Sequence, residues 1–351
     1  MKTTRDGRPF LVIGENIHAT RIVLRSGKRV VATPDGREAL IFAGADGSTR
    51  QLVVPDAVRS SASFGGGKVK HVRAALVAAL SGSDRDAEAG RAYLAWLAAR
   101  QVAAGADYLD LNVDEISERP EDQRAAMAWL VAAIEAESPI PVALDSSTTE
   151  IIRAGLEARD ASRPAPLLNS ASLERLDVLD LAAEHGCPVV VTAAGGTDLP
   201  SNAGERVANA MRMVEAAGAR GIPLDRLHID AIVLPVAVDP AVGGYVVDAI
   251  ARLRADLGPA VHLTGGFSNV SYGLPVRKLI NDVFIDLAAE AGADSGIVDP
   301  VASDLDLVFA QDRAARPYRL AENLLRGNDP YGMEFLAAYR SGTLGGGPAG
   351  S

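Results

Sequence analysis

Helical and strand patterns alternate along this chain from Gly82 to Val298, and this alternation constrains the fold more than any other feature. In the first repeat, Ser83 can cap a helix over 84–104, Gly105 can end it, and 108–113 follows the pattern of a strand. Such alternation implies parallel strands joined by helical crossovers. Residues 10–16 supply one more strand, giving eight in a chain of 351 residues. The sequence therefore predicts an α/β fold, a closed (β/α)8 TIM barrel over residues 1–341. The expected helices are 84–104, 121–137, 148–158, 173–185, 203–219, 240–257 and 275–291, and the strands after the first are 108–113, 139–144, 166–170, 188–193, 227–234, 261–267 and 295–298.

Residues 21–73 break this alternation. Turn signals at Ser26-Gly27, Asp35-Gly36 and Asp46-Gly47 separate short β-type runs, which predicts a small β-meander inserted after the first strand. The segment holds ten Lys or Arg and four Asp or Glu, a local charge of +6 that leaves −16 for the rest. It is either a solvated flap or a lid or docking surface for an acidic partner or a polyanionic substrate tail. At the other end, the Gly-rich residues 342–351 are expected to form a flexible tail.

Composition excludes several classes of protein. The net charge is −10 and aromatic residues make up 5%, which argues against a nucleic-acid binder. No run approaches the 18 or so apolar residues of a transmembrane helix, and the polar start does not resemble a secretory signal. The one cysteine, Cys187, excludes an intramolecular disulfide and disfavours a Cys-based metal site. We therefore expect a cytoplasmic protein without a membrane contact.

Polar side chains gather at the expected carboxyl ends of the strands, where the site of such a barrel lies. In chain order they are Glu15, Asn16, Asp110, Asn112, Asp145, Ser146, Asn169, Ser170, Thr192, Asp230, Ser268, Asn269 and Asp299. Because His, Cys and Lys are nearly absent from this set, zinc, a Schiff base and a Cys nucleophile are disfavoured. A ring of Asp and Asn can bind a divalent cation, or a flat heterocycle with several N–H groups such as a pterin. Composition alone does not choose between these two ligands.

Structural roles compete with binding at each of these positions. A single Asp at a strand end often caps the next helix, and Asp145, just before Ser146-Ser147, fits that pattern. Asp110 and Asn112 lie on one face of their strand, where a polar layer inside the barrel is an alternative to a pocket. The five histidines are scattered, and although His18 follows the first strand, a structural role is favoured for each of them.

Five short motifs follow one another at the expected strand ends: IGENI at 13–17, LDLNVDE at 109–115, LDSS at 144–147, LNS at 168–170 and GGFSNVS at 265–271. With these motifs, the sequence from Val12 to about Asp299 resembles the pterin-binding (β/α)8 methyltransferases, once the insert is set aside. These are the methyltetrahydrofolate:corrinoid-protein methyltransferases and the folate domain of cobalamin-dependent methionine synthase.

The resemblance implies both a reaction and the residues that carry it. The N5-methyl group would move between methyltetrahydrofolate and the cobalt of a corrinoid. Asn269 would be the catalytic residue, nearest N5, while no resident metal is implied. The substrate-binding residues would be Asp145, Asn169 and Asp230 on the pterin edge, with Asp110, Asn112, Ser268, Glu15 and Asn16 in the same pocket.

The resemblance also implies partners. Since no Asp-x-His-x-x-Gly run is present, we expect the cobalamin to be carried by a separate corrinoid protein. Family members are usually homodimers. Two alternatives remain: a dihydropteroate synthase-like enzyme, whose corresponding strand end resembles Ser-Arg-Lys where this chain has Ser268-Asn269-Val270, and a non-catalytic pterin-binding subunit of a methyl-transfer complex.

Overall fold

The structure is a computed structural model that describes residues 1–196 and 198–344. The chain forms two compact units, unit 1 (Met1–Ile13 and Ser170–Ser351) and unit 2 (Gly14–Asn169). Both have an α/β fold in which parallel strands alternate with helices. Of the tail expected at 342–351, residues 345–351 lie outside the described residues. Among the helices described here, none has the length and apolar character needed to cross a membrane.

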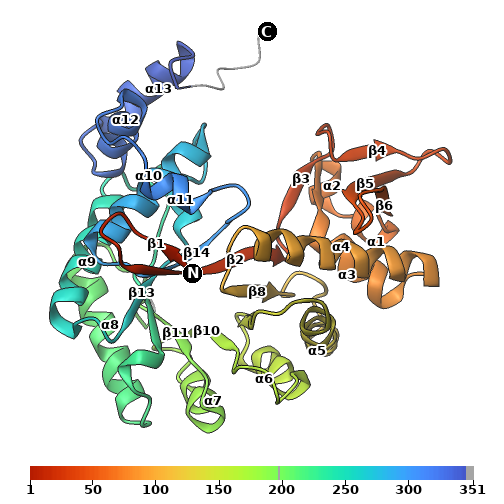
Figure 1. Cartoon of the computed structure of the whole chain (residues 1–351), viewed down its shortest axis with the longest axis horizontal. Helices are drawn as coiled ribbons and strands as arrows, with labels where there is room; N and C mark the ends of the chain where they lie inside the picture. The colour runs from red at the N-terminus through yellow and green to blue at the C-terminus, as the bar shows by residue number, and fades with distance from the viewer. Residues whose placement is uncertain (197, 345–351) are drawn as a thin grey trace. The chain divides into compact units, whose positions relative to one another are not determined.

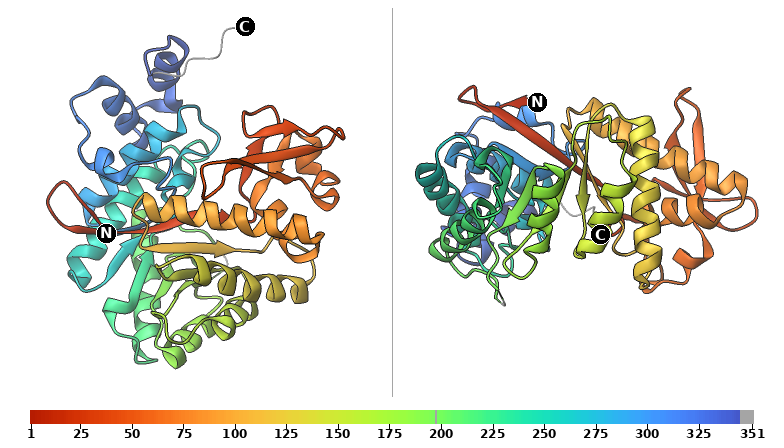
Figure 2. Two further views of the ribbon diagram at one scale, coloured as in Figure 1. Left: turned by 45° about the vertical axis from the view of Figure 1, so that its right-hand side comes forward. Right: turned by 90° about the horizontal axis from the view of Figure 1, so that it is seen from below.

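Unit 2 is built on parallel strands β8 (Tyr108–Asn112), β9 (Val142–Asp145) and β10 (Leu167–Ala171). All but the first residue of β8 are buried, because helices cover the sheet. These helices are α4 (Asp84–Ala103), α5 (Pro120–Glu137) and α6 (Thr149–Ala158), and α4 packs along α5 (Figure 2). Ser83 caps α4 as expected, since its hydroxyl accepts a hydrogen bond from the Asp86 N–H.

Residues 22–70 of unit 2 are rich in short β-strands. β4 (Val30–Ala32), β5 (Glu38–Ala43) and β6 (Thr49–Val53) form an antiparallel meander that packs on α4 (Figure 1). β3 (Ile22–Leu24) pairs with β7 (Lys68–Lys70), and the short helices α1 (Asp56–Arg59) and α2 (Ala62–Gly65) lie between β6 and β7. The next helix, α3 (His71–Ser81), begins inside the expected insert of 21–73.

Local ion pairs neutralise part of the positive charge of this segment. Arg25 pairs with Glu38, Arg37 with Asp35 and Arg59 with Asp56. Two further cations reach carboxylates outside the insert: Arg50 lies 2.6 Å from Glu88, and Lys70 lies 2.7 Å from Glu115. The pairs within the insert are already counted in its net charge of +6, so only pairs that reach outside it, such as those with Glu88 and Glu115, reduce this excess. The role of the insert as a lid or docking surface stays a prediction.

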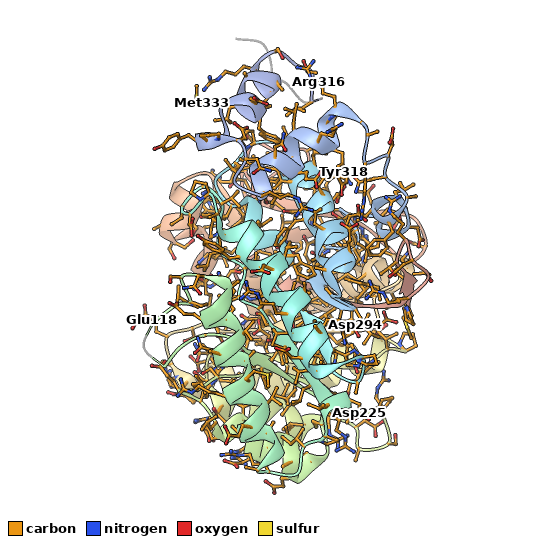
Figure 3. All side chains as sticks on the ribbon, turned by 90° about the vertical axis from the view of Figure 1, so that its left-hand side faces the viewer. Glu118, Asp225, Asp294, Arg316, Tyr318 and Met333 are labelled. Carbon is orange, nitrogen blue, oxygen red and sulfur yellow. The ribbon has the colours of Figure 1, made fainter. Side chains whose placement is uncertain are left out.

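Unit 1 contains the parallel strands β11 (Val189–Thr192), β12 (Leu227–Asp230) and β13 (His262–Thr264). Strand β14 (Ser295–Val298) follows, and β1 (Lys2–Thr3) pairs antiparallel with the start of β2 (Pro9–His18). The helices are α7 (Asp177–His185), α8 (Ala203–Gly218), α9 (Val242–Leu257) and α10 (Arg277–Ala291). Figure 3 shows α8, α9 and α10, which pack side by side.

Two of the strands in unit 1 are shorter than the sequence predicts. The strand expected over 227–234 ends at Asp230, because Ile232 adopts a left-handed conformation with φ of 56°. The strand expected over 261–267 ends at Thr264, and a 3₁₀ turn, η2 (Phe267–Ser271), follows Gly265 and Gly266. The chain therefore leaves the sheet directly after Asp230 in the first case, and just before Ser268 and Asn269 in the second.

Helices after Asp299 were not expected from the sequence. They are α11 (Leu305–Phe309), α12 (Arg316–Leu325) and α13 (Met333–Arg340), and the 3₁₀ turn η3 (Pro330–Gly332) lies between the last two. Another 3₁₀ turn, η1 (Leu224–Arg226), comes earlier, directly before β12. The buried carboxylate of Asp286 on α10 anchors this region, since it accepts hydrogen bonds from Tyr318 Oη at 2.8 Å and from Arg313 Nε at 2.8 Å.

Candidate functional site

Three polar side chains form a row across the carboxyl ends of β8, β9 and β10. In the sheet register Asn112 lies opposite Asp145, and Asp145 lies opposite Asn169. Asp110 stands two residues earlier on β8 and therefore on the same face as Asn112. Asp110, Asn112 and Asn169 are buried, and the Asp145 side chain keeps 23% of its exposure. The structure thus brings these four predicted binding residues together in unit 2.

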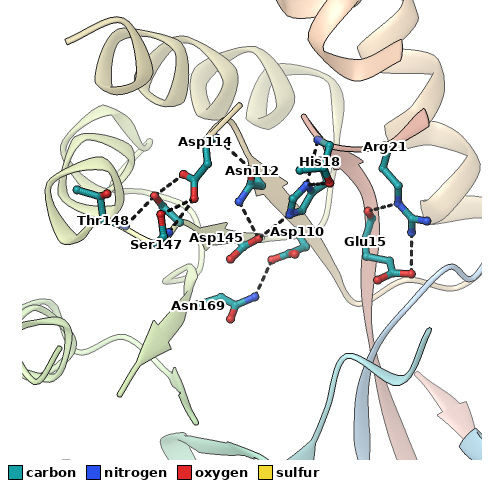
Figure 4. Close-up of polar contacts among 12 residues, drawn as sticks. Glu15, His18, Arg21, Asp110, Asn112, Asp114, Asp145, Ser147, Thr148 and Asn169 are labelled. Atoms are coloured by element: carbon teal, nitrogen blue, oxygen red, sulfur yellow. Dashed lines mark hydrogen bonds and ion pairs between the residues drawn. The ribbon is translucent and has the colours of Figure 1, made fainter. Parts of the chain in front are cut away.

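The amide groups in this row are oriented by the carboxylates (Figure 4). Asn112 donates through Nδ2 to Asp145 Oδ2 at 3.0 Å, and Asn169 donates through Nδ2 to Asp110 Oδ1 at 3.2 Å. Three oxygens, Asp110 Oδ2, Asp145 Oδ1 and Asn169 Oδ1, accept no hydrogen bond from any described residue. The row therefore presents acceptors to a ligand whose edge carries N–H donors.

Asp110 is the electrostatically unusual member of the row. Burial raises the pKa of its carboxyl well above the ordinary value, and the nearby charge of Asp145, followed by that of Glu15, raises it further. The hydrogen bond from Asn169 and the charge of Arg21 oppose this pKa increase. A buried carboxyl whose pKa is raised both by burial and by a specific neighbouring charge is a feature of functional sites.

His18, at the end of β2, contacts the same row. Its Nε2 lies 3.2 Å from Asp145 Oδ2, and its Nδ1 lies 2.7 Å from the hydroxyl of Thr20. Sequence reasoning favoured a structural role for His18 and did not connect it with Asp145. The two residues are 127 positions apart in the sequence, so only the folded sheet brings them together.

Glu15 and Asn16 lie on β2 next to His18 but are held by other residues. Arg21 forms an ion pair with the Glu15 carboxylate at 2.7 Å and donates through Nε to the Glu15 backbone oxygen at 3.1 Å. The backbone N–H of Asn16 donates to Gln101 Oε1 at 3.0 Å. That amide lies directly over Gly14, so a Cβ there would displace the Gln101 side chain from Asn16.

Asp114, which the sequence analysis did not single out, joins the loops that follow β8 and β9. Its carboxylate accepts hydrogen bonds from Ser146 Oγ at 2.5 Å and from Ser147 N and Oγ, both at 2.9 Å. The alternative that Asp145 caps the following helix is wrong. Thr148 is the N-cap residue of α6, and the Asp145 carboxylate faces Asn112 and His18 instead.

A second row crosses β11, β12 and β13 in unit 1. Thr192 lies opposite Asp230, and Asp230 lies opposite Thr264. The hydroxyls of Thr192 and Thr264 are buried and have no hydrogen-bond partner in the described part of the chain. Two unpaired hydroxyls beside a carboxylate leave hydrogen-bonding capacity for a ligand.

Burial raises the pKa of Asp230 from 3.8 to about 6. The backbone N–H of Ile232, 2.8 Å from Asp230 Oδ1, and the charge of Arg206 lower this pKa but do not outweigh burial. Asp230 is therefore present in both protonation states near neutral pH.

Asn269 and Ser268 lie in η2, directly after β13. The Asn269 side chain is exposed, and its amide has no hydrogen-bond partner among the residues that the structure describes. The amide lies over Gly266, where an added Cβ would approach Asn269 Nδ2 to 3.0 Å. Arg277 fixes the turn, since it donates to the Ser268 backbone oxygen at 2.8 Å and to Ser271 Oγ at 3.0 Å. The turn therefore presents Asn269 with both its oxygen and its nitrogen available.

Two other predicted polar residues have local partners. Ser170 binds Arg175, and the Asp299 carboxylate accepts from the backbone N–H groups of Val301 and Ala302. In residues 1–196 and 198–344, no group of three or more His, Cys, Asp or Glu is arranged to hold a metal ion.

The family model described as "Pterin binding enzyme" matches residues 89–299. A methylcorrinoid:tetrahydrofolate methyltransferase from Eubacterium limosum is 28% identical over 264 residues, which are 74% of this chain and 91% of that protein. Methionine synthase from Mycobacterium tuberculosis is 32% identical over 217 residues, 58% of this chain but 18% of the synthase. This chain thus spans most of the first relative and less than a fifth of the second.

The solved structures that resemble this chain include dihydropteroate synthases. The enzyme from Stenotrophomonas maltophilia aligns with a TM-score of 0.49 at 20% identity, over 64% of this chain and 86% of that chain. The enzyme from Xanthomonas albilineans in complex with 7,8-dihydropteroate aligns with a TM-score of 0.47 at 22% identity, over 65% and 87%.

Proposed function

Because this chain belongs to the pterin-binding enzymes, whose family model covers residues 89–299, we propose that it is a methyltransferase. It moves the N5-methyl group between methyltetrahydrofolate and the cobalt of a corrinoid carried by a separate protein. The methylcorrinoid:tetrahydrofolate methyltransferase that aligns over 91% of its own length supports this choice of reaction.

The observation that carries the proposal is the row of unengaged acceptors on β8, β9 and β10. The pyrimidine edge of a pterin carries an exocyclic amine beside a ring N–H, and a carboxylate can accept from both in parallel. Asp145 Oδ1, Asn169 Oδ1 and Asp110 Oδ2 offer acceptors close together in this row. The acceptor pattern of the row therefore fits a pterin.

Methyl transfer requires N5 to become a leaving group. The C–N bond breaks, its electron pair stays on N5, and the methyl carbon goes to the electron pair of the acceptor, for which cobalt(I) of the corrinoid serves. A neutral tertiary amine leaves poorly, so N5 must be protonated or strongly hydrogen-bonded as the bond breaks. The Asn269 amide oxygen accepts a hydrogen bond from N5–H⁺ and so stabilises the charge that N5 carries.

Asn269 is suited to this role because its amide makes no hydrogen bond to the described part of the protein. N5 takes its proton from solvent, and the hydrogen bond from N5–H⁺ to the Asn269 oxygen stabilises this protonated leaving group by about 2–4 kcal/mol. Removing this hydrogen bond therefore lowers the rate of methyl transfer by roughly 30-fold to 10³-fold. Folate affinity depends mainly on the pterin-edge contacts and changes much less.

The test measures both affinity and turnover. The purified protein is titrated with 5-methyltetrahydrofolate, and methyl transfer to cob(I)alamin is followed by its absorbance. We expect Asn269→Ala to bind methyltetrahydrofolate within about threefold of wild type and to lose methyl transfer. The matched control is Asn328→Ala, at an exposed asparagine in the same unit, and this variant should keep both methyltetrahydrofolate affinity and methyl transfer.

Three outcomes would contradict the proposal. Condensation of p-aminobenzoate with a pterin diphosphate would identify a dihydropteroate synthase, and folate binding without either activity would identify a binding subunit. Equal losses of affinity and rate in Asn269→Ala would remove Asn269 from the catalytic role.

A further inference from the structure

Arg206 on α8 is a fully buried arginine that binds only backbone oxygens. Its relative exposure is 0%, and hydrogen bonds to a carboxylate are absent among the described residues. It donates through Nε to Ala231 O at 3.0 Å and through Nη1 to Pro200 O and Asn202 O, both at 3.1 Å. Burying a guanidinium in this way is unfavourable unless the bonds it makes fix something that the protein needs.

The segment that Arg206 holds is strained. Ile232 has a φ of 56°, and a β-branched side chain at positive φ is a genuine outlier. Arg206 reaches the oxygen of this same residue from two nitrogens, Nε at 3.4 Å and Nη2 at 3.3 Å. The left-handed turn at Ile232 therefore depends on the arginine that binds its carbonyl oxygen.

The backbone that Arg206 holds also fixes Asp230, a candidate binding residue. The peptide group between Ala231 and Ile232 carries both the oxygen that Arg206 Nε binds and the N–H that donates to Asp230 Oδ1 at 2.8 Å. This leaves Oδ2 of Asp230 for a ligand, beside the unpaired hydroxyls of Thr192 and Thr264. A displacement of about 1 Å in such a group is enough to impair a site.

We propose that Arg206 is a positioning residue for folate binding: it clamps the oxygens of Ala231 and Ile232 so that the strained turn aims the Asp230 carboxylate at the pterin. The clamp rests on the proposed function, because it assumes that Asp230 binds the pterin. Arg206 itself does not touch the ligand.

The test is a double-mutant cycle with tetrahydrofolate as the probe. Arg206→Lys keeps the charge but loses the forked donor geometry, and we expect its dissociation constant to rise roughly tenfold, because the strained turn loses its restraint. Adding Ile232→Gly removes the steric penalty of positive φ, so the double variant should recover most of this loss. A purely structural role of the buried arginine would give no such rescue.

Arg254→Lys is the matched control. Arg254 also binds three backbone oxygens in unit 1, those of Gly258, Val261 and Gly292, but these precede β13 and β14 and lie at the other end of the strands. We expect its tetrahydrofolate affinity to equal that of wild type. Hydrogen exchange of residues 231–236, which needs no ligand, should accelerate in Arg206→Lys and not in Arg254→Lys.

Ile232→Pro covers the case in which Arg206→Lys fails to fold. Proline fixes φ near −65° and removes the N–H that binds Asp230, so tetrahydrofolate binding should weaken by at least the same factor. The clamp would be overturned if Ile232→Pro or Arg206→Lys bound tetrahydrofolate as tightly as wild type. It would also be overturned if the double variant bound tetrahydrofolate as weakly as Arg206→Lys. Failure of the wild-type protein to bind tetrahydrofolate would instead contradict the proposed function.

Discussion

Replacing Asp230 with asparagine is expected to stabilise the protein while it weakens the site. Burial raises the pKa of Asp230 from 3.8 to about 6, so the folded state binds a proton more tightly than the unfolded chain does. Each tenfold difference in proton affinity corresponds to about 1.4 kcal/mol, so keeping this carboxylate ionised costs the fold about 3 kcal/mol above pH 6. Asparagine is neutral at every pH and can still accept from the Ile232 N–H.

The sign of the pH dependence follows from the raised pKa. Below pH 3.8 the carboxyl is protonated in both the folded and the unfolded state, and the penalty vanishes. It grows between the two pKa values and is complete above pH 6. Asp230→Asn should therefore raise the free energy of unfolding by about 1 kcal/mol at pH 4.5 and by about 3 kcal/mol at pH 8.

Urea unfolding at these two pH values, followed by circular dichroism, measures the difference. Tryptophan fluorescence is the wrong probe, because Trp96 and Trp129 both lie in unit 2 whereas Asp230 lies in unit 1. Asp225→Asn, an exposed residue just before β12, is the control and should show no pH-dependent gain. The reasoning is refuted if Asp230→Asn is less stable than wild type at pH 8, or if its gain is the same at both pH values.

The remaining predictions concern the two rows and the turn after β13. Asp145→Asn should weaken tetrahydrofolate binding roughly tenfold in a calorimetric titration, since it removes a charged acceptor; unchanged affinity would exclude Asp145 from the pocket. Gly266→Ala places a Cβ 3.0 Å from Asn269 Nδ2, so methyl transfer to cob(I)alamin should slow while folate affinity persists. His18→Ala leaves one oxygen of Asp145 with a single donor, and folate affinity should fall by roughly threefold to tenfold; His185→Ala, on a helix end in unit 1, is the comparison that should not change.

The helices and strands from Gly82 to Val298 were predictable because each carries its own signals. Ser83 before α4 and Gly186 after α7 mark helix ends by capping and by positive φ, and the apolar strands between them are too short to be helices. The strand end at Thr264 was missed although Gly265-Gly266 is itself a turn signal, because the expected strand was extended across both glycines to Phe267. The three helices after Asp299 were missed because the earlier helices were recognised by their alternation with strands, and no strand follows these three among the described residues.

The candidate site was predictable to the extent that it follows from strand register. Parallel strands end at the same edge, so Asn112, Asp145 and Asn169 could be grouped from sequence alone. His18 could not, because it meets Asp145 only through the packing of strands that are 127 residues apart in the sequence. Asp114 could not, because its serine partners lie in the loop after β9, whose course no local pattern encodes. Whether the polar residues of unit 2 and those of unit 1 bind one ligand stays a prediction.

Two loops of unit 1 each combine a β-branched residue at positive φ with an arginine that binds the loop. This combination beside two candidate binding residues argues for a role in function. Ile232 follows Asp230, and Val276 follows the turn that carries Asn269; both are β-branched residues at positive φ, 56° and 53°. An arginine binds each loop: Arg206 through the oxygens around Ile232, and Arg277 through Ser268 and Ser271. Local preference opposes both conformations by about 1–3 kcal/mol each, so the sequence around them gives no sign of the turns. A chain under selection for stability alone would place glycine at these positions. On the first loop Arg206 holds the oxygen of the β-branched Ile232, and on the second Arg277 holds Ser268 and Ser271 on either side of Asn269. Restricting each loop to one conformation is what a carboxylate and a carboxamide need if they are to meet a ligand without first being ordered.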